Sequence, residues 1–359
     1  MGAVRMRARG DVRRRWRSGI GLALLVGLVA AVVLTAAAGA RRTATSFDRF
    51  LAQSKVGDAF VFSGEATPQQ VRDFARAPYI TAISHIQTLQ VVYPDGTFPN
   101  AGAPVDGHLG TTLERARILE GRAADPKSTT EITINESIAR QQHLRVGDTL
   151  ALSSFTPAQI DAQRNGTATD IPEPGGPAVR LRVVGISRLP SDLGLDGTNG
   201  GILLLTPGFG RRYAGQIGSY GGDLLAVRLR HGAADFDRFA RRASGFFGRA
   251  PAFAVQPSGQ GDGGVRQSID VLALGAAIFA GVAALAGLAA LGLVLRRRID
   301  VGAGDQEVLR SLGLTRAQRA LAVGVPAVPF AVLGALVGVL GAWLASPLLP
   351  IGLARKAEP

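Results

Sequence analysis

Three long runs without a charged residue constrain the fold of this chain more than any other feature. They cover Ser18–Ala40, Val271–Leu295 and Ala320–Ala354. A helix needs about 20 apolar residues to cross the hydrocarbon core of a bilayer, so each run is long enough for one membrane span. We therefore predict an α-helical membrane protein with three transmembrane helices, at 18–40, 271–295 and 320–346.

The arginines indicate which ends of these runs face the cytoplasm. Residues 1–17 hold seven arginines and one acid, and residues 296–319 hold six arginines against three acids. Short basic segments stay on the cytoplasmic side of a membrane. We therefore expect a basic cytoplasmic tail at 1–17, a cytoplasmic loop at 296–319, an extracytoplasmic domain at 41–270 and an extracytoplasmic tail at 347–359. The protein would be a multi-pass protein of the cell membrane.

The first run has an alternative interpretation as a secretory signal peptide. Ala38–Ala40 resembles a small-residue cleavage site, and the basic tail resembles the start of a signal sequence. The run is longer than the roughly 7–15 apolar residues of a signal core, which favours an uncleaved membrane anchor. Both interpretations export the region that follows.

The formal net charge of +13 raises the possibility of nucleic-acid binding. The region 41–270 contributes only +3 of this charge, from 25 Lys+Arg less 22 Asp+Glu. The remaining excess lies beside the uncharged runs, as the positive-inside distribution of membrane proteins predicts. A contiguous basic footprint for nucleic acid is not visible, so we expect the lipid bilayer and not nucleic acid as a partner. The chain has no cysteine, so redox chemistry does not reveal its compartment.

The extracytoplasmic region has the pattern of a large mixed α/β domain. An apolar run at 58–62, a Thr67-Pro68 pair typical of a helix start and a strand-like run at 79–92 form a βαβ-like unit. A second such unit covers 224–255. Strand-like runs between them lie at 131–134, 149–152, 179–186 and 201–205. We predict two βαβ-like units bracketing a β-rich insertion in one bilobed domain, with a linker at 256–264 before the second span.

Small residues recur every four positions in the second and third spans. They are Ala276, Ala280 and Ala284 in the second span, and Gly334 and Gly338 in the third. This spacing places small side chains on one helix face and allows close helix packing in lipid. General richness in alanine and glycine is the alternative explanation.

The cytoplasmic loop contains the pattern of a short amphipathic helix. Asp305 is a typical N-cap, and the apolar residues Val308, Leu309 and Leu312 follow at helical spacing before Gly313, a typical residue after a helix end. A helix this short is marginal by itself in water. Its apolar face therefore needs a partner to pack against.

Residues that could carry ATP hydrolysis are missing from the sequence. A phosphate-binding P-loop needs lysine directly after glycine, and none of Lys55, Lys127 and Lys356 meets this requirement. Gly259–Gly264 formally matches a dinucleotide-binding GxGxxG pattern. It stands beside a membrane span and not between a strand and a soluble helix, which favours a linker.

Other catalytic and metal-binding patterns are also missing. The histidines are scattered without metal-ligand spacing, and we expect them to be surface or half-buried polar residues. They are His85, His108, His143 and His231. Asp235 and Asp237 lie among arginines and are typical of solvated pairs. We therefore expect no catalytic residue, no metal site and no cofactor in this chain.

The loop sequence Glu307–Gln318 resembles the cytoplasmic signature of FtsX-like permeases, the MacB-type subunits of ABC transporters. Residues 130–152 and 179–187 also resemble stretches of that family's extracytoplasmic core domain. In that family a large extracytoplasmic domain lies between the first and second membrane helices. The family has at least a fourth membrane helix, so the resemblance implies that this chain is truncated after its third.

The resemblance implies a permease that binds a separate ABC-type ATPase through a cytoplasmic coupling helix at Gln306–Leu312. Val308, Leu309 and Leu312 would fill an apolar cleft on the ATPase, and Glu307 and Arg310 would form the polar rim. The residues of this partner-binding site are Gln306, Glu307, Val308, Leu309, Arg310, Leu312 and Gly313. A second permease copy or half is a further implied partner. ATP hydrolysis would then move the membrane helices and the extracytoplasmic domain, for export or for mechanotransmission.

Three other functions remain alternatives at this point. The first is an ATPase-coupled regulator of an extracytoplasmic cell-wall hydrolase, and the second is a membrane-anchored binding or sensory protein. The third, an enzyme in the extracytoplasmic domain, has no catalytic pattern to support it. A neighbouring gene for an ATPase would separate the permease and the hydrolase regulator from the others.

Overall fold

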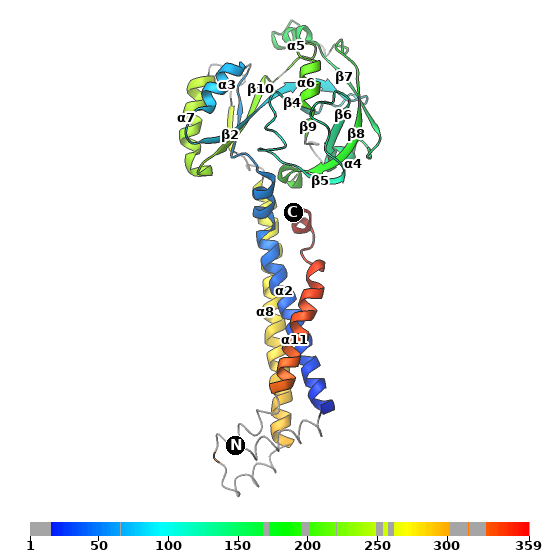
Figure 1. Ribbon diagram of the computed structural model, residues 1–359, viewed down its shortest axis with the longest axis vertical. Coiled ribbons are helices and arrows are strands. Elements are labelled where there is room, and N and C mark those ends of the chain that lie inside the picture. The colour runs from blue at the N-terminus through cyan, green and yellow to red at the C-terminus, as the bar shows by residue number, and fades with distance from the viewer. Residues whose placement is uncertain are drawn as a thin grey trace. The chain divides into compact units, whose positions relative to one another are not determined.

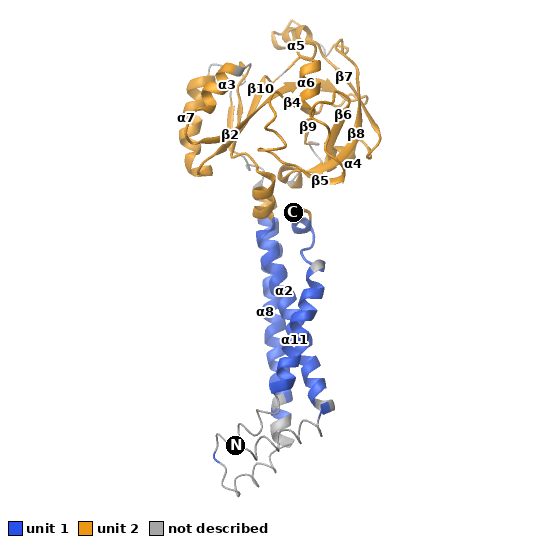
Figure 2. Ribbon diagram, viewed as in Figure 1, with its two compact units in different colours: residues 1–46, 267–355 blue, residues 47–266, 356–359 orange. Residues whose placement is uncertain are grey.

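The computed structural model describes residues 16–64, 66–167, 172–194, 201–219, 221–248, 254–257, 262–301, 315 and 328–358. The chain divides into two compact units, which Figure 2 shows in different colours. One unit comprises residues 1–46 and 267–355 and holds the apolar helices. The other comprises residues 47–266 and 356–359 and holds the β-sheets.

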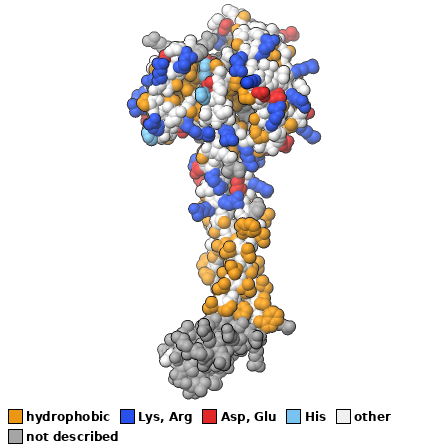
Figure 3. All heavy atoms as spheres, viewed as in Figure 1, with side chains coloured by type: hydrophobic (Ala, Val, Ile, Leu, Met, Phe, Trp, Pro, Cys, Tyr) orange, Lys and Arg blue, Asp and Glu red, His pale blue; other side chains and the backbone are white. Residues whose placement is uncertain are grey.

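Three helices are long and apolar enough to cross a membrane, as the sequence predicted. They are α2 (Trp16–Ser54), α8 (Asp262–Val301) and α11 (Val328–Ala345), labelled in Figure 1. Hydrophobic side chains gather over the apolar stretches of these helices, whereas charged side chains gather over the β-sheet unit (Figure 3). The predicted fold class, three apolar helices with a mixed α/β domain, is confirmed.

Two of the helices are much longer than their apolar runs. α2 has 39 residues and α8 has 40. At 1.5 Å per residue each is about 60 Å long, roughly twice the hydrocarbon thickness of a bilayer. The predicted linker at 256–264 is wrong at both ends, because β11 (Ala254–Pro257) includes its first residues and α8 includes its last.

The larger sheet contains both predicted βαβ-like units. In sheet order its strands are β11 (Ala254–Pro257), β1 (Ala59–Phe62), β10 (Asp223–Leu229), β2 (Ile80–Leu89), β4 (Asn100–Pro104) and β9 (Ile202–Leu204). β10 lies between β1 and β2 and is antiparallel to both, and β1 lies in the same way between β10 and β11. Each unit is therefore a split βαβ, and the two interleave in one sheet.

The crossover helices of these units, α3 (Pro68–Ala75) and α7 (Phe236–Phe247), lie side by side (Figure 1). Thr67 begins α3, as the sequence predicted, and the structure adds a capping box between Thr67 and Gln70. Phe74 of α3 and Phe239 of α7 are fully buried together with Val61 and Leu225 of the sheet. Burial of these side chains forms a core between the larger sheet and its two crossover helices.

The second sheet is built from the insertion. Its strands are β3 (Val91–Val92), β7 (Thr149–Ser154), β8 (Val179–Arg188) and β5 (Arg117–Gly121) in sheet order, and β6 (Glu131–Asn135) also pairs with β8. β6 runs parallel to β8, whereas β7 and β5 run antiparallel to it. The predicted β-rich insertion is therefore confirmed, although β4, β5 and α5 (Pro157–Arg164) were not predicted.

Short helices close the core of this second sheet. They are α4 (Glu136–Gln141), α6 (Pro207–Arg212) and the 3-10 turn η1 (Pro190–Gly194). Ile138 of α4 and Phe209 of α6 pack with Ile132, Leu150 and Leu181 of the strands. The remaining short elements are η2 (Gly232–Asp235), η4 (Ser346–Leu348) and α12 (Leu353–Lys356).

Candidate functional site: the membrane helices and their attachment to the domain

α11 packs against α2 through small residues. Gly334 and Gly338 are buried on α11. A Cβ atom placed on Gly338 would lie 2.6 Å from Cβ of Ala30, and one on Gly334 would lie 2.8 Å from the carbonyl oxygen of Ala23. Both distances are shorter than real side chains tolerate, so only glycine permits this approach. The predicted interhelical role of Gly334 and Gly338 is confirmed.

The partner face on α2 was not identified from the sequence. It consists of Gly19, Ala23 and Gly27, which are buried and stand four residues apart. The ring of Phe330 covers Gly19, and Val337 packs over Gly27. The signal was available, because this spacing of small residues is the same one that marked the other two spans.

α8 meets α2 at a second small-residue contact. Val29 of α2 lies directly against Gly287 of α8. Ala280 is buried on α8, and Ala276 and Ala284 are half-buried, so the predicted alanine stripe faces the helix bundle. An apolar cavity of about 300 Å³ between α2 and α8 is lined in part by Ala30, Ala284 and Gly287.

In the β-sheet unit, α2 and α8 meet again, close to the C-terminal end of α2 and the N-terminal end of α8. Phe47 and Phe50 of α2 are buried there. The guanidinium group of Arg266 on α8 lies 5.5 Å from the ring centroid of Phe47 and forms a 3.0 Å ion pair with Asp48. The two helices are therefore joined in both units.

Both helices lead directly into the larger sheet. After α2 ends at Ser54, the backbone N–H of Arg115 donates to the Ser54 carbonyl oxygen at 2.7 Å, and β1 begins at Ala59. On the other side, β11 precedes α8 and pairs antiparallel with β1, with Ala59 opposite Pro257. A displacement of α2 relative to α8 would therefore act on two neighbouring strands.

The predicted coupling helix lies outside the described residues. None of its seven assigned residues is among those that the structure describes; they are Gln306, Glu307, Val308, Leu309, Arg310, Leu312 and Gly313. The structure describes the start of the loop, where α8 continues as a helix to Val301. The assignment of these seven residues therefore stays a prediction.

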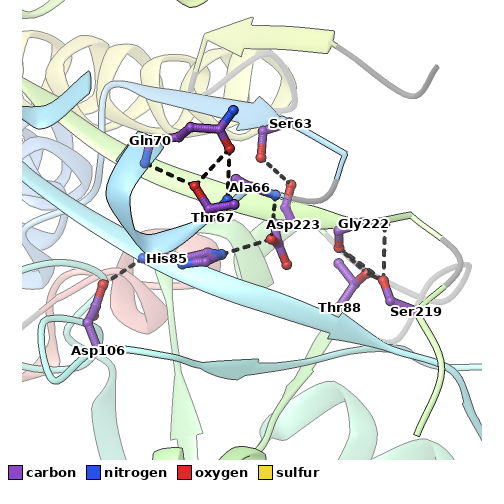
Figure 4. A network of polar contacts seen from close by, with 10 residues as sticks. All are labelled: Ser63, Ala66, Thr67, Gln70, His85, Thr88, Asp106, Ser219, Gly222 and Asp223. Carbon is purple, nitrogen blue, oxygen red and sulfur yellow. Dashed lines mark hydrogen bonds and ion pairs between the residues drawn. The ribbon is translucent and has the colours of Figure 1, made fainter. Parts of the chain in front are cut away.

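A polar network in the larger sheet contains the one histidine that the sequence placed wrongly. His85 is buried, not half-buried or on the surface, and its Nε2 lies 3.0 Å from Oδ2 of Asp223 (Figure 4). The same carboxylate oxygen accepts a 2.9 Å hydrogen bond from the backbone N–H of Ala66, before α3. Oδ2 of Asp106 accepts from the backbone N–H of His85. The carboxylate of Asp223 gives the imidazole of His85 a polar partner, which explains how a histidine is accommodated inside the sheet.

The network holds elements together and does not form a nucleophilic relay. The hydroxyl group of Ser63 donates to the backbone carbonyl of Asp223 and not to His85 (Figure 4). Among the described residues, no group of three or more histidine, aspartate or glutamate side chains could hold a metal ion. The hydrogen bonds of this network therefore connect β2, β10 and the start of α3.

A second polar cluster joins β6, α4 and η1. The side chain of Asn135 accepts from the backbone N–H of Ile138 at 2.7 Å and donates to Oδ1 of Asp192 at 3.0 Å. Burial raises the pKa of Asp192 to about 6, although hydrogen bonds from Leu189 and Asn135 oppose this effect. Burial would also raise the pKa of Glu136, but its hydrogen bonds with Arg188 bring that pKa below its ordinary value.

The raised pKa of Asp192 predicts that the β-sheet unit loses stability as pH rises. The folded pKa lies above the unfolded value, so the stabilisation is complete below the unfolded pKa and is lost as pH rises through about 6. Between about pH 5 and pH 7.5 the free energy of unfolding should fall by about 1–1.5 kcal/mol. Urea unfolding of the fragment 47–264 at several pH values measures this change.

Asp192→Asn provides the control for this prediction. It removes the titrating group and keeps the side-chain volume, so this part of the decline should disappear. Subtraction of the variant from the parent also removes the contributions of all other titrating groups. An equal decline in both proteins would contradict the assignment to Asp192.

Comparison with known proteins does not by itself assign the chain to a family. No protein-family model matches it, and no curated protein matches it in sequence. Among solved structures, the periplasmic region of MacB from Actinobacillus actinomycetemcomitans is 10% identical, with a TM-score of 0.33, over 61% of this chain and 95% of that one. The extracellular domain of the ABC-type transporter YknZ from Gram-positive bacteria is 9% identical, with a TM-score of 0.32, over 56% of this chain and 99% of that one.

Proposed function

We propose that this chain is a membrane permease subunit of an ABC transporter. In this proposal a separate ATPase hydrolyses ATP, and the chain couples that reaction to movement of its membrane helices and extracytoplasmic domain. The observation that supports it best is the α2–α8 pair, which is joined in both units and continues into adjacent strands β1 and β11. The loop motif Glu307–Gln318, with its resemblance to FtsX-like permeases, supports the ATPase as the driving partner.

The helix pair is suited to transmit a displacement. Each helix is continuous over about 60 Å, and a continuous α-helix moves largely as one body because every turn is hydrogen-bonded to the next. Small residues let α2 contact both α8 and α11 closely. Movement at one end of α2 would therefore change its position against both neighbours and act on β1. The extracytoplasmic domain would respond on the opposite side of the membrane from the ATPase.

The coupling helix at Gln306–Leu312 is the proposed site of the ATPase. Replacing Leu309 by aspartate should abolish co-purification of the ATPase in detergent and leave membrane insertion intact. Leu309 is central to an apolar face that needs a partner. A carboxylate there would be buried without an opposite charge, which costs several kcal/mol. The measurement is the amount of co-expressed ATPase retained by the purified chain.

Arg316→Ala is the matched control for Leu309→Asp. Arg316 lies in the same loop but beyond the proposed helix, and an exposed charge contact is worth roughly 0–1 kcal/mol. This variant should retain most of the ATPase. If Leu309→Asp retains the ATPase as well as the parent does, the loop is a topological anchor only and the coupling proposal is wrong.

A further inference from the structure

One face of the second sheet carries two neighbouring exposed arginines. At the start of β8, Val179 and Leu181 point into the core, whereas Arg180 and Arg182 are exposed on the opposite face. Alternate residues of a strand share one face and stand about 7 Å apart. The two guanidinium groups therefore form a short row on the outer surface of the sheet.

Short side chains beside this row leave an open depression. Arg182 lies opposite Thr149 of β7 and beside Glu131 of β6, and Arg180 lies opposite Ala151 of β7. The side chains of threonine and alanine are shorter than that of arginine, so they leave space beside the two arginines. The result is a shallow depression of about 610 Å³, lined by Thr130, Glu131, Thr149, Ala151, Arg180 and Arg182.

The depression has an excess of positive charge. Both carboxylate oxygens of Glu131 are engaged by Arg122, at 2.9 and 2.5 Å, and the backbone N–H of Asp125 donates to one of them. The hydrogen bonds from Arg122, followed by that from Asp125, lower the pKa of Glu131 to about 2. Glu131 is therefore ionised at neutral pH, and the charge of Arg122 balances it. The side chain of Arg180 has no hydrogen bond or ion pair with any residue that the structure describes, whereas its backbone belongs to the β7–β8 ladder. Arg180 and Arg182 therefore face the depression with a charge of +2 beyond the Arg122–Glu131 pair.

We propose that this face binds an extended acidic segment of a partner protein, with carboxylates on alternate residues. A guanidinium group matches a carboxylate with two parallel hydrogen bonds. An extended chain places alternate side chains about 7 Å apart, which equals the spacing of Arg180 and Arg182. The hydroxyl groups of Thr130 and Thr149 can donate to or accept from the backbone of such a segment.

The shape of the depression favours a chain segment over a small molecule. Sites for small molecules enclose most of the ligand, whereas this depression is broad and open to solvent. An extended segment that runs along β8 needs no enclosure, because its side chains reach Arg180 and Arg182 from the solvent side of the sheet. This inference does not depend on the proposed ATPase coupling, since every residue involved belongs to the extracytoplasmic domain.

Binding of short labelled peptides to the full chain in detergent micelles tests the proposal by fluorescence anisotropy. A peptide of alternating glutamate and threonine should bind, with an affinity that falls as salt rises. A peptide of the same composition, with its glutamates in one block, should bind more weakly. Arg180→Glu/Arg182→Glu should weaken the alternating peptide by at least about tenfold and should bind an alternating lysine and threonine peptide instead.

Arg211→Glu/Arg241→Glu is the matched control. It makes the same change in net charge at two exposed arginines on α6 and α7, and it should leave peptide affinity unchanged. The neutral variant Arg180→Gln/Arg182→Gln should also lose binding while its thermal midpoint stays that of the parent. The proposal is overturned if the control weakens binding equally or if both glutamate peptides bind alike. It is also overturned if polyphosphate or anionic lipid vesicles bind and the alternating peptide does not.

Discussion

Replacing Gly338 by leucine is expected to break the packing of α11 on α2. The nearest neighbours of the added side chain would be Cβ of Ala30 at 2.6 Å, the carbonyl oxygen of Gly27 at 3.3 Å and the backbone nitrogen of Ala31 at 3.4 Å. Two of these are backbone atoms that cannot turn aside, so the helices must separate. We expect a loss of about 3 kcal/mol or more, at the upper end of overpacking costs.

The measurement is the midpoint of thermal denaturation of the full chain in detergent. Gly281→Leu is the matched control, because a Cβ atom on Gly281 of α8 meets no atom within 4 Å. The same substitution there should leave the midpoint unchanged or raise it slightly, since leucine favours a helix more than glycine does. Equal losses in both variants would mean that the interface with α2 does not decide the stability of α11.

Local signals account for the elements that the sequence predicted. Thr67 and Thr206 each precede a proline, and each begins a helix with its side-chain oxygen accepting a hydrogen bond from the backbone N–H three residues later. The start of α5 carries the same signal at Thr156 and was overlooked, although it could have been found. Small residues at four-residue spacing likewise predicted the buried glycines of α11.

Long-range pairing explains what the sequence did not predict. β4 has the sequence of a loop, with glycine, alanine and proline, and it becomes a strand because β2 and β9 pair with it on either side. The interleaving of the two βαβ units has the same origin, since it depends on which distant strands meet. His85 of β2 is buried beside Asp223 of the neighbouring strand β10, and no local sequence pattern predicts that pair.

The candidate site likewise has one part that local sequence patterns predict and one part that depends on residues far apart in the sequence. The close helix contacts needed only the spacing of small residues, which a single span displays by itself. The junction of α2 and α8 in the β-sheet unit, at Phe47, Asp48 and Arg266, needed both helices to extend beyond their apolar runs. Charge marked the predicted ends of those spans at 40 and 271, whereas the helices continue through charged residues because their backbone hydrogen bonds do not depend on lipid.

Phe74→Ala is expected to have the largest effect on the stability of the β-sheet unit. The ring of Phe74 is fully buried, and its centroid lies 5.1 Å from that of Phe247, 5.5 Å from that of Phe246 and 5.6 Å from that of Phe239. It thereby joins α3 to α7 above the sheet. Removing it creates a cavity at the centre of that contact, and the free energy of unfolding should fall by about 3–5 kcal/mol.

Urea unfolding of the fragment 47–264 measures this loss. Phe98→Ala is the matched control, because the ring of Phe98 is 42% exposed and stacks on Phe155 at 5.9 Å. Its truncation should cost less than about 1.5 kcal/mol. Phe74→Leu, which refills most of the cavity, should recover more than half of the loss. If Phe98→Ala costs as much as Phe74→Ala, the α3–α7 contact is not the core that stabilises the larger sheet.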